Sequence, residues 1–209
     1  CDTCASTATN IQTTQLFDVL ITNTYGCTVE DSVFITVNPL PQLIINPDTG
    51  ICFGSNVELN VSGASQYRWT STDPQFNCNN CNTAVIQPED DAQYFVEGEN
   101  QFGCLANDTF SIDVFQYEAG ILLSDSSVCF PDSLQYLDAS FAESGIASWE
   151  WNFGNGAIST QQNTYYAHSQ PGYYPIQLSI ISNENCMDTA HRNVRIHALP
   201  EIIAGPDTS

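Results

Sequence analysis

The chain has 209 residues, of which 42% are hydrophobic, and it carries 24 acidic side chains against three arginines and no lysine. A formal net charge of −21 excludes nucleic acid as a partner, because binding to a phosphate backbone needs clustered basic side chains. No apolar run is long enough to cross a membrane as a helix, and nine cysteines indicate an oxidising, extracellular compartment.

The sequence repeats itself, which indicates a window from a tandem array of small modules. Three cysteines recur 77 positions later in the chain, namely Cys1, Cys4 and Cys27 as Cys78, Cys81 and Cys104. We therefore predict the end of one repeat in 1–41, a whole repeat in 42–118, a second whole module in 119–199 and the start of another repeat in 200–209. The export signal and any anchor are expected outside this sequence.

Short β-strands are predicted along the whole chain, because runs rich in β-branched and aromatic residues alternate in polarity between turn residues. In chain order these runs include 57–61, 67–71, 93–97 and 109–114. Trp149, Trp151 and Phe153 then alternate with polar residues, so their rings should share one face of a core strand. The predicted fold is all-β, a tandem array of immunoglobulin-like (Ig-like) β-sandwich modules.

One stretch resembles a known family. Trp151-Asn-Phe-Gly-Asn-Gly156, followed by Thr164-Tyr-Tyr166 and the run 171–179, is similar to the PKD domain, whose signature is Trp-x-Phe-Gly-Asp-Gly with a later Tyr-rich strand. Asn155 stands where the family usually has Asp, which suits the turn but weakens a cation role. The preceding repeat contains Tyr67-Arg-Trp69, the loop Cys78-Asn-Asn-Cys81, Ala92-Gln-Tyr-Phe-Val96 and Gly103-Cys104. With these residues it resembles Ig-like repeats of giant secreted proteins of Bacteroidetes.

The resemblance implies a non-catalytic structural or adhesive repeat region of a giant secreted or cell-surface protein, such as a gliding-motility adhesin exported by the type IX route. Its partners would be neighbouring repeats of the same chain, surface glycans or other cell-surface proteins. The alternative is a spacer or carbohydrate-binding accessory region of a secreted enzyme that degrades polysaccharide or protein. We do not expect an enzyme here, nor a bound cofactor other than a calcium ion.

The cysteines can be paired by elimination. Because 119–199 contains only Cys129 and Cys186, we predict that these two are bonded, and the equivalent pair one module earlier is Cys52 with Cys104. Two short-range pairs remain: Cys78 with Cys81, and Cys1 with Cys4. Cys27 is expected to have its partner upstream of the sequence.

The two C-x-x-C pairs invite other interpretations. A zinc ribbon needs two such pairs about 15–20 residues apart, and a thioredoxin-like motif needs a helix after the pair. Neither condition is met, so a local disulfide across a loop is favoured.

Candidate sites for ions and modification are few. Hard oxygen ligands suit Ca²⁺, so the acidic turn Glu89, Asp90 and Asp91 is a candidate calcium site beside its reading as a solvated turn. The three histidines, His168, His191 and His197, are predicted to lie at the surface. The resemblance further implies O-glycans on Asp-Ser/Thr motifs, which selects Ser32, Ser133 and Thr189 beside a simple turn role.

Overall fold

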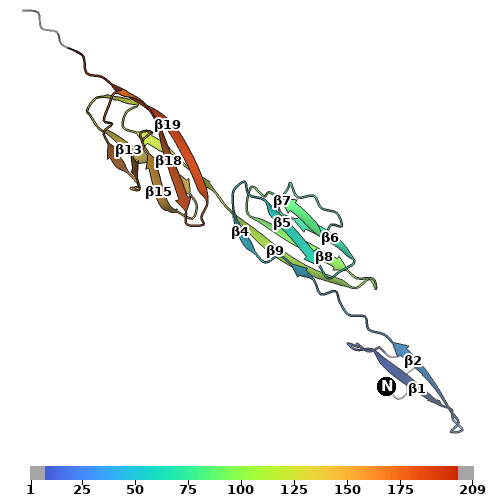
Figure 1. Ribbon diagram of the computed structural model, residues 1–209. Coiled ribbons are helices and arrows are strands. Elements are labelled where there is room, and N and C mark those ends of the chain that lie inside the picture. Colours follow the sequence, from blue (N-terminus) through green and yellow to red (C-terminus); the bar gives the residue numbers. More distant parts are fainter. Residues whose placement is uncertain (1–7, 202–209) are drawn as a thin grey trace, which may run out of the picture. The chain divides into compact units, whose positions relative to one another are not determined.

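The computed structural model describes residues 8–201. Backbone contacts group these residues into two compact units, the first made of 8–47, 58–86 and 93–110 and the second of 48–57, 87–92 and 111–201. All regular elements in this range are strands, as the sequence predicts (Figure 1). No helix among the described residues is long and apolar enough to cross a membrane.

The first unit begins with an isolated hairpin. Strands β1 (Gln15–Thr22) and β2 (Thr28–Ile35) pair antiparallel from Gln15 opposite Ile35 to Thr22 opposite Thr28. Apolar side chains on both strands are exposed to solvent, for example Leu20 and Phe34. The hairpin therefore contains strand pairing without a core of its own.

The middle module consists of strands β3 to β9 and contributes to both units. One sheet has the order β3 (Ile44–Ile45), β5 (Val57–Ser62), β7 (Thr83–Ile86). The other has the order β4 (Thr49–Cys52), β9 (Leu105–Phe115), β8 (Ala92–Glu99), β6 (Gln66–Ser71). The four runs predicted as strands fall within β5, β6, β8 and β9, so these predictions are confirmed.

Alternating side chains form the core of the middle module. Burial in β8 follows a period of two, which places Tyr94 and Val96 inside and leaves Phe95 exposed. The Tyr94 ring stacks on Phe110 with centroids 5.0 Å apart. The Tyr94 hydroxyl donates to Asp73 at 3.0 Å, and burial together with this carboxylate raises the pKa of the phenol. Such aromatic pairs stabilise a core beyond the area that they bury.

The last module, β10 to β19, lies in the second unit. Its larger sheet has the order β12 (Ser127–Cys129), β19 (Met187–His197), β18 (Gly172–Ser182), β15 (Ile146–Asn152), β16 (Ile158–Ser159). The opposing sheet has the order β11 (Ile121–Leu123), β13 (Leu134–Asp138), β17 (Thr164–Tyr166). A short pair, β10 (Tyr117–Glu118) with β14 (Phe141–Ala142), forms a separate two-stranded sheet.

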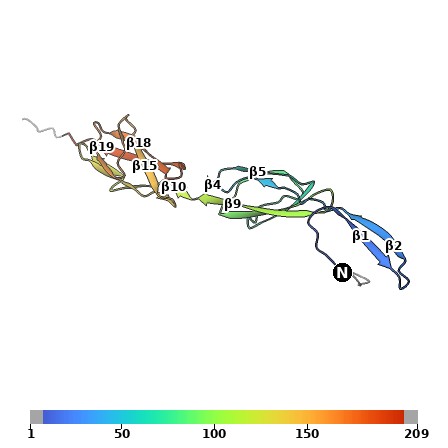
Figure 2. The ribbon, with the colours of Figure 1, turned by 90° about the horizontal axis from the view of Figure 1, so that it is seen from below.

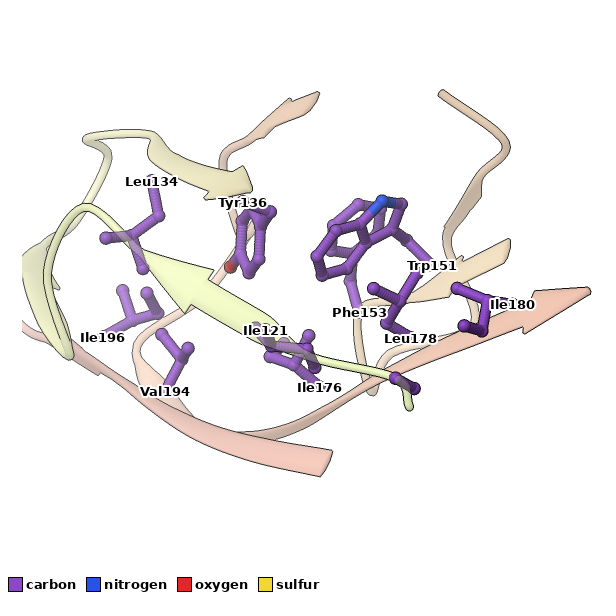
Figure 3. Packing of buried hydrophobic residues seen from close by; sticks show 11 residues of the cluster. Ile121, Leu134, Tyr136, Trp151, Phe153, Ile176, Leu178, Ile180, Val194 and Ile196 are labelled. Atoms are coloured by element: carbon purple, nitrogen blue, oxygen red, sulfur yellow. The ribbon is translucent and has the colours of Figure 1, made fainter. Parts of the chain in front are cut away.

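Aromatic rings from both sheets meet in the core of the last module (Figure 3). Trp151 and Phe153 are fully buried, and Tyr136 contacts both edge to face at 5.9 and 5.1 Å between centroids. Trp149 is half-buried, and its indole N–H donates to Asp138 at 2.8 Å. The predicted core strand is confirmed, with Trp149 at the margin of the core.

In each whole module, an edge strand of the larger sheet is parallel to the last strand of the module. Figure 2 shows β4 beside β9. Strand β4 runs alongside β9 from Thr49 opposite Ile112 to Cys52 opposite Phe115. Strand β12 pairs with β19 in the same way, ending with Cys129 opposite His197. In each module this register places the edge-strand cysteine beside the final residue of the last strand.

Candidate functional site

The cysteines form the candidate functional site, and the structure pairs them differently from the sequence prediction. Cys52 is bonded to Cys186, with Cα atoms 5.5 Å apart and a sequence separation of 134. The bond joins β4 of the middle module to the β18–β19 hairpin of the last module. The predicted bonds Cys52–Cys104 and Cys129–Cys186 are therefore wrong.

Strand length explains the correction. Cys104 immediately precedes the 11-residue strand β9, whereas Cys52 lies beside its last residue, Phe115. At about 3.3 Å per residue the two cysteines are roughly 36 Å apart along the strand, whereas a disulfide needs Cα atoms within about 7 Å. The same geometry separates Cys129 from Cys186 across β19. The 77-residue offset locates equivalent cysteines but does not show at which end of a module each one lies.

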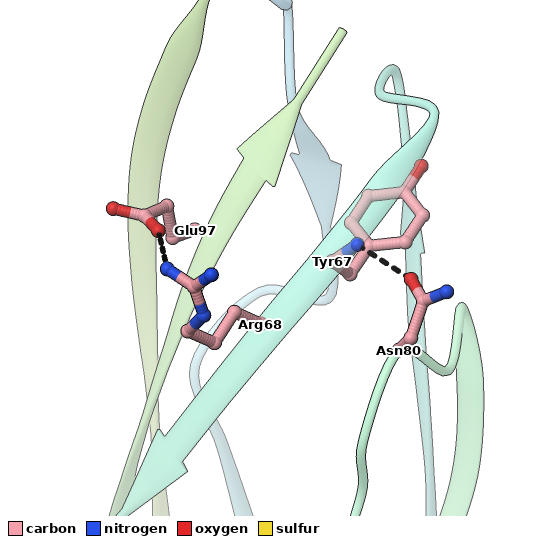
Figure 4. A network of polar contacts seen from close by, with 4 residues as sticks. All are labelled: Tyr67, Arg68, Asn80 and Glu97. Atoms are coloured by element: carbon pink, nitrogen blue, oxygen red, sulfur yellow. Dashed lines mark hydrogen bonds and ion pairs between the residues drawn. The ribbon is translucent and has the colours of Figure 1, made fainter. Parts of the chain in front are cut away.

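The local disulfide Cys78–Cys81 is confirmed, with Cα atoms 5.9 Å apart. Its loop is attached to β6, because the Asn80 side chain accepts the Tyr67 N–H at 2.9 Å (Figure 4). The Cys81 carbonyl also accepts the Trp69 indole N–H at 3.0 Å. Asn80 has a φ of 58°, a conformation that Asn adopts more readily than most residues. The bond therefore fixes a tight loop against a core strand. Cys1 and Cys4 lie outside the described residues.

Three cysteines of the described range form no bond. Cys27 and Cys129 are exposed, and Cys104 is partly exposed.

The acidic turn does not form a metal site. Glu89, Asp90 and Asp91 are all exposed, and no group of three His, Cys, Asp or Glu side chains in residues 8–201 gathers as a metal ion would require. The Asp91 carboxylate accepts the Val114 N–H at 2.7 Å, and the Glu89 carbonyl accepts from Gln116 at 2.8 Å. These groups connect the turn to the end of β9, so the structure supports the turn reading and not the calcium prediction.

The surface prediction is wrong for His168, which is only 2% exposed. Its ring stacks on Tyr174 at 3.8 Å between centroids, and Nε2 lies 3.1 Å from the Tyr136 hydroxyl, whose own pKa burial raises to about 12. Nδ1 has no hydrogen-bond partner. Burial disfavours the charged imidazolium and lowers the pKa of His168. The isolated spacing of the histidines in the sequence contains no signal of this burial.

The four tyrosines of β17 and β18 alternate between solvent and the core, as the geometry of a strand requires. Tyr165 and Tyr173 are about 70% exposed (69% and 71%), whereas Tyr166 and Tyr174 pack against the core of the last module. The Arg195 guanidinium lies 5.0 Å from the centre of the Tyr173 ring. A cation over an aromatic face is a weakly stabilising contact at an exposed site.

The three glycan candidates are accessible. Ser32, Ser133 and Thr189 are all exposed. The Asp31 carboxylate accepts the Ser32 N–H at 2.8 Å, which is the alternative turn role, and the Thr189 hydroxyl lies 3.1 Å from that of Ser179. Ser32 is both accessible to modification and hydrogen-bonded in a local turn. These two observations do not choose between the two roles, so glycosylation of Ser32 stays a prediction.

The aromatic strand of the last module leads into a tight turn. Asn152 accepts the Gly154 N–H at 2.9 Å, Asn155 accepts the Ala157 N–H at 3.2 Å, and the Asn155 amide donates to the Tyr166 hydroxyl at 2.9 Å. Gly154 has a φ of 75°, and a Cβ atom there would lie 2.7 Å from the Pro175 carbonyl oxygen, so only glycine fits.

Residues 124–196 match the family model of the PKD domain. The turn and the aromatic core just described lie within this range, and we call the last module the PKD module from here on. The match and the disulfides of the chain indicate an extracellular protein made of PKD-like and Ig-like β-sandwich repeats. The predicted boundaries at 41/42, 118/119 and 199/200 stay predictions.

Similar solved structures include two isolated PKD domains and one multidomain protein. The PKD1 domain of Vibrio anguillarum Epp is 21% identical at a TM-score of 0.36, and the match covers 40% of this chain and 95% of that domain. The PKD1 domain of the Vibrio cholerae metalloprotease PrtV is 23% identical at 0.34, covering 38% and 95%. The insect immune protein hemolin is 13% identical at 0.45, covering 88% and 56%. No curated protein matches the chain.

Proposed function

We propose that this chain is a non-catalytic, tension-carrying repeat region of a cell-surface adhesive protein. The observation that supports this best is the Cys52–Cys186 bond, which connects one module covalently to the next. A catalytic domain needs a fixed fold around its site, and a disulfide within the domain is sufficient to stabilise that fold. A bond between neighbouring repeats instead limits how far the chain can be drawn out.

The route of the force explains the value of such a bond. When tension is applied to the two ends of the chain, it passes from Cys52 directly to Cys186 through the disulfide. The strands β5 to β9 and β10 to β18 lie between these cysteines in the sequence and are relieved of the load. The residues between the two cysteines can then unfold and refold without lengthening the tether, which suits an adhesive protein under shear.

The charge of the chain fits a surface location. With a formal net charge of −21, copies of the repeat repel one another, which keeps a dense surface layer soluble and separated. We propose, on the resemblance of the sequence to Bacteroidetes repeats, that the parent protein is a gliding-motility type adhesin exported by the type IX route. Its partners would then be surface glycans or other cell-surface proteins.

Antibodies against the 209-residue chain test this proposal on the source cells. We expect them to label unpermeabilised cells, and we expect their Fab fragments to reduce attachment of these cells to glass under flow. A Cys52→Ser change in the chromosomal gene should leave static attachment unchanged and should reduce attachment under flow. A double change Cys78→Ser, Cys81→Ser, which removes a disulfide within one module, is the matched control.

Two outcomes would contradict the proposal. Antigen confined to the culture medium, precipitating together with a polysaccharide- or protein-degrading activity, would make the chain an accessory region of a secreted enzyme. Retention of the purified chain on a cellulose, chitin or agarose column would show a carbohydrate-binding module instead.

A further inference from the structure

Three hairpins of the chain hold a cysteine in the same way. They span 23–27, 100–104 and 182–186, and in each the first residue donates its N–H to the carbonyl of the cysteine, at 3.0, 3.1 and 2.8 Å. The side chain of the first residue accepts the cysteine N–H at 3.0 Å in all three. The residue before the cysteine has a positive φ: 81°, 76° and 62° for Gly26, Gly103 and Asn185.

Two edge strands hold a cysteine in a second common way. Cys52 and Cys129 each end the strand that runs parallel to the last strand of their module. The next residue donates its N–H to the carbonyl of that last strand's final residue, at 3.1 Å for Phe53 and 2.9 Å for Phe130. A turn closed by the cysteine carbonyl follows, at 3.0 and 2.8 Å. We call these the edge position and the preceding set the hairpin position.

One edge position and one hairpin position are already bonded to each other, because Cys52 is joined to Cys186. The cysteines that form no bond among the described residues occupy the same two kinds of position. Cys27 and Cys104 are hairpin cysteines, and Cys129 is an edge cysteine. No described cysteine falls outside this scheme except the local pair Cys78–Cys81.

We propose that Cys27, Cys104 and Cys129 are each one half of a disulfide between modules. Cys129 is bonded to the hairpin cysteine of a following module of the same kind. Cys104 and Cys27 are each bonded to the edge cysteine of a preceding module. The partner is thus a thiol presented by another repeat, in the geometry that Cys52 and Cys186 show. Three accessible thiols in an oxidising compartment would otherwise be open to uncontrolled oxidation and exchange.

The spacing of these bonds gives the array a property that a single disulfide lacks. The Cys52–Cys186 bond closes a loop with a sequence separation of 134, whereas the next edge cysteine, Cys129, stands only 77 residues after Cys52. The loop that would start at Cys129 therefore overlaps the Cys52–Cys186 loop by 57 residues. Every backbone position in a continuous array then lies inside at least one loop, so that one proteolytic cut anywhere leaves the two parts covalently joined.

The bond forms by two successive exchange steps. The thiolate of Cys129 attacks a small-molecule or protein disulfide, here oxidised glutathione, and releases one glutathione thiolate. The hairpin thiolate then attacks the Cys129 sulfur of the mixed disulfide and releases the second glutathione. Two cysteine thiols lose two protons and two electrons, and one glutathione disulfide is reduced to two glutathione molecules.

The purified chain tests this pairing, because one copy can supply the edge cysteine and another the hairpin cysteine. In a Cys27→Ser variant, Cys104 and Cys129 are the remaining unbonded cysteines of the described range. Incubation with a mixture of oxidised and reduced glutathione should produce covalent dimers and longer chains on a non-reducing gel. Peptide mapping should find Cys104–Cys129 in great excess over the two symmetric bonds.

A variant without Cys129 shows whether the covalent dimers depend on the edge cysteine. A Cys27→Ser, Cys129→Ser chain should form almost no covalent dimer, while the Cys52–Cys186 bond and the circular dichroism spectrum stay unchanged. Symmetric Cys104–Cys104 and Cys129–Cys129 bonds at the level of random pairing would overturn the proposal. So would a product with glutathione adducts only. Neither result depends on adhesion, so this inference can fail while the proposed function stands.

Discussion

Tension on the chain offers a direct measure of the Cys52–Cys186 bond. In a single-molecule stretching experiment with handles at both ends, the intact bond prevents extension of the residues between the two cysteines. Their sequence separation is 134. At about 3.3–3.6 Å for each extended residue, a Cys52→Ser chain should therefore reach a contour length about 440–480 Å greater than the native chain.

The local disulfide does not alter this expectation, because Cys78 and Cys81 are only three residues apart in the chain. A Cys27→Ser chain serves as the control and should extend as far as the native chain. Addition of a reductant to the stretched native chain should release the same hidden length in one step. If the native and Cys52→Ser chains reached equal contour lengths, the bond between the modules would be refuted.

Three further predictions concern the PKD module and the surface. Because burial lowers the pKa of His168, the unfolded chain gains a proton near pH 6.5 before the folded chain does; stability should be complete above that pH and should fall as the pH drops below it. Urea unfolding should show this loss in the native chain and in a His191→Gln control but not in His168→Gln. Burial by itself would raise the pKa of Asp138, yet hydrogen bonds from Ser140, Gln162 and Trp149 outweigh it and lower the pKa. Asp138→Ala should therefore cost about 1–3 kcal/mol in the urea unfolding of the PKD module at neutral pH, and this cost should shrink as the pH falls below about 4. Intact-mass analysis of protein from the source cells should show added hexose masses that mapping assigns to three side chains: Ser32, Ser133 and Thr189. Unmodified peptides at all three would contradict that prediction.

Local sequence patterns determined the strands and the short-range bond. A strand with one buried face shows its period of two directly in the sequence, as β8 and the Trp151 strand do. The turn of the PKD module needs glycine and Asn at set positions, so it could be recognised from residues 151–156 alone. Cys78 and Cys81 are close in the chain, and no knowledge of the fold was needed to pair them.

Long-range contacts were decided by the tertiary structure. The sequence does not show that β4 and β12 are parallel to the last strand of their module, and that pairing alone moves Cys52 and Cys129 to the end opposite the hairpin cysteine. His168 is equally polar in the sequence whether it faces solvent or stacks on Tyr174. The repeat by itself determined which cysteines are equivalent. Only the fold determined which of them can meet, because a disulfide depends on distance in space and a repeat records distance along the chain.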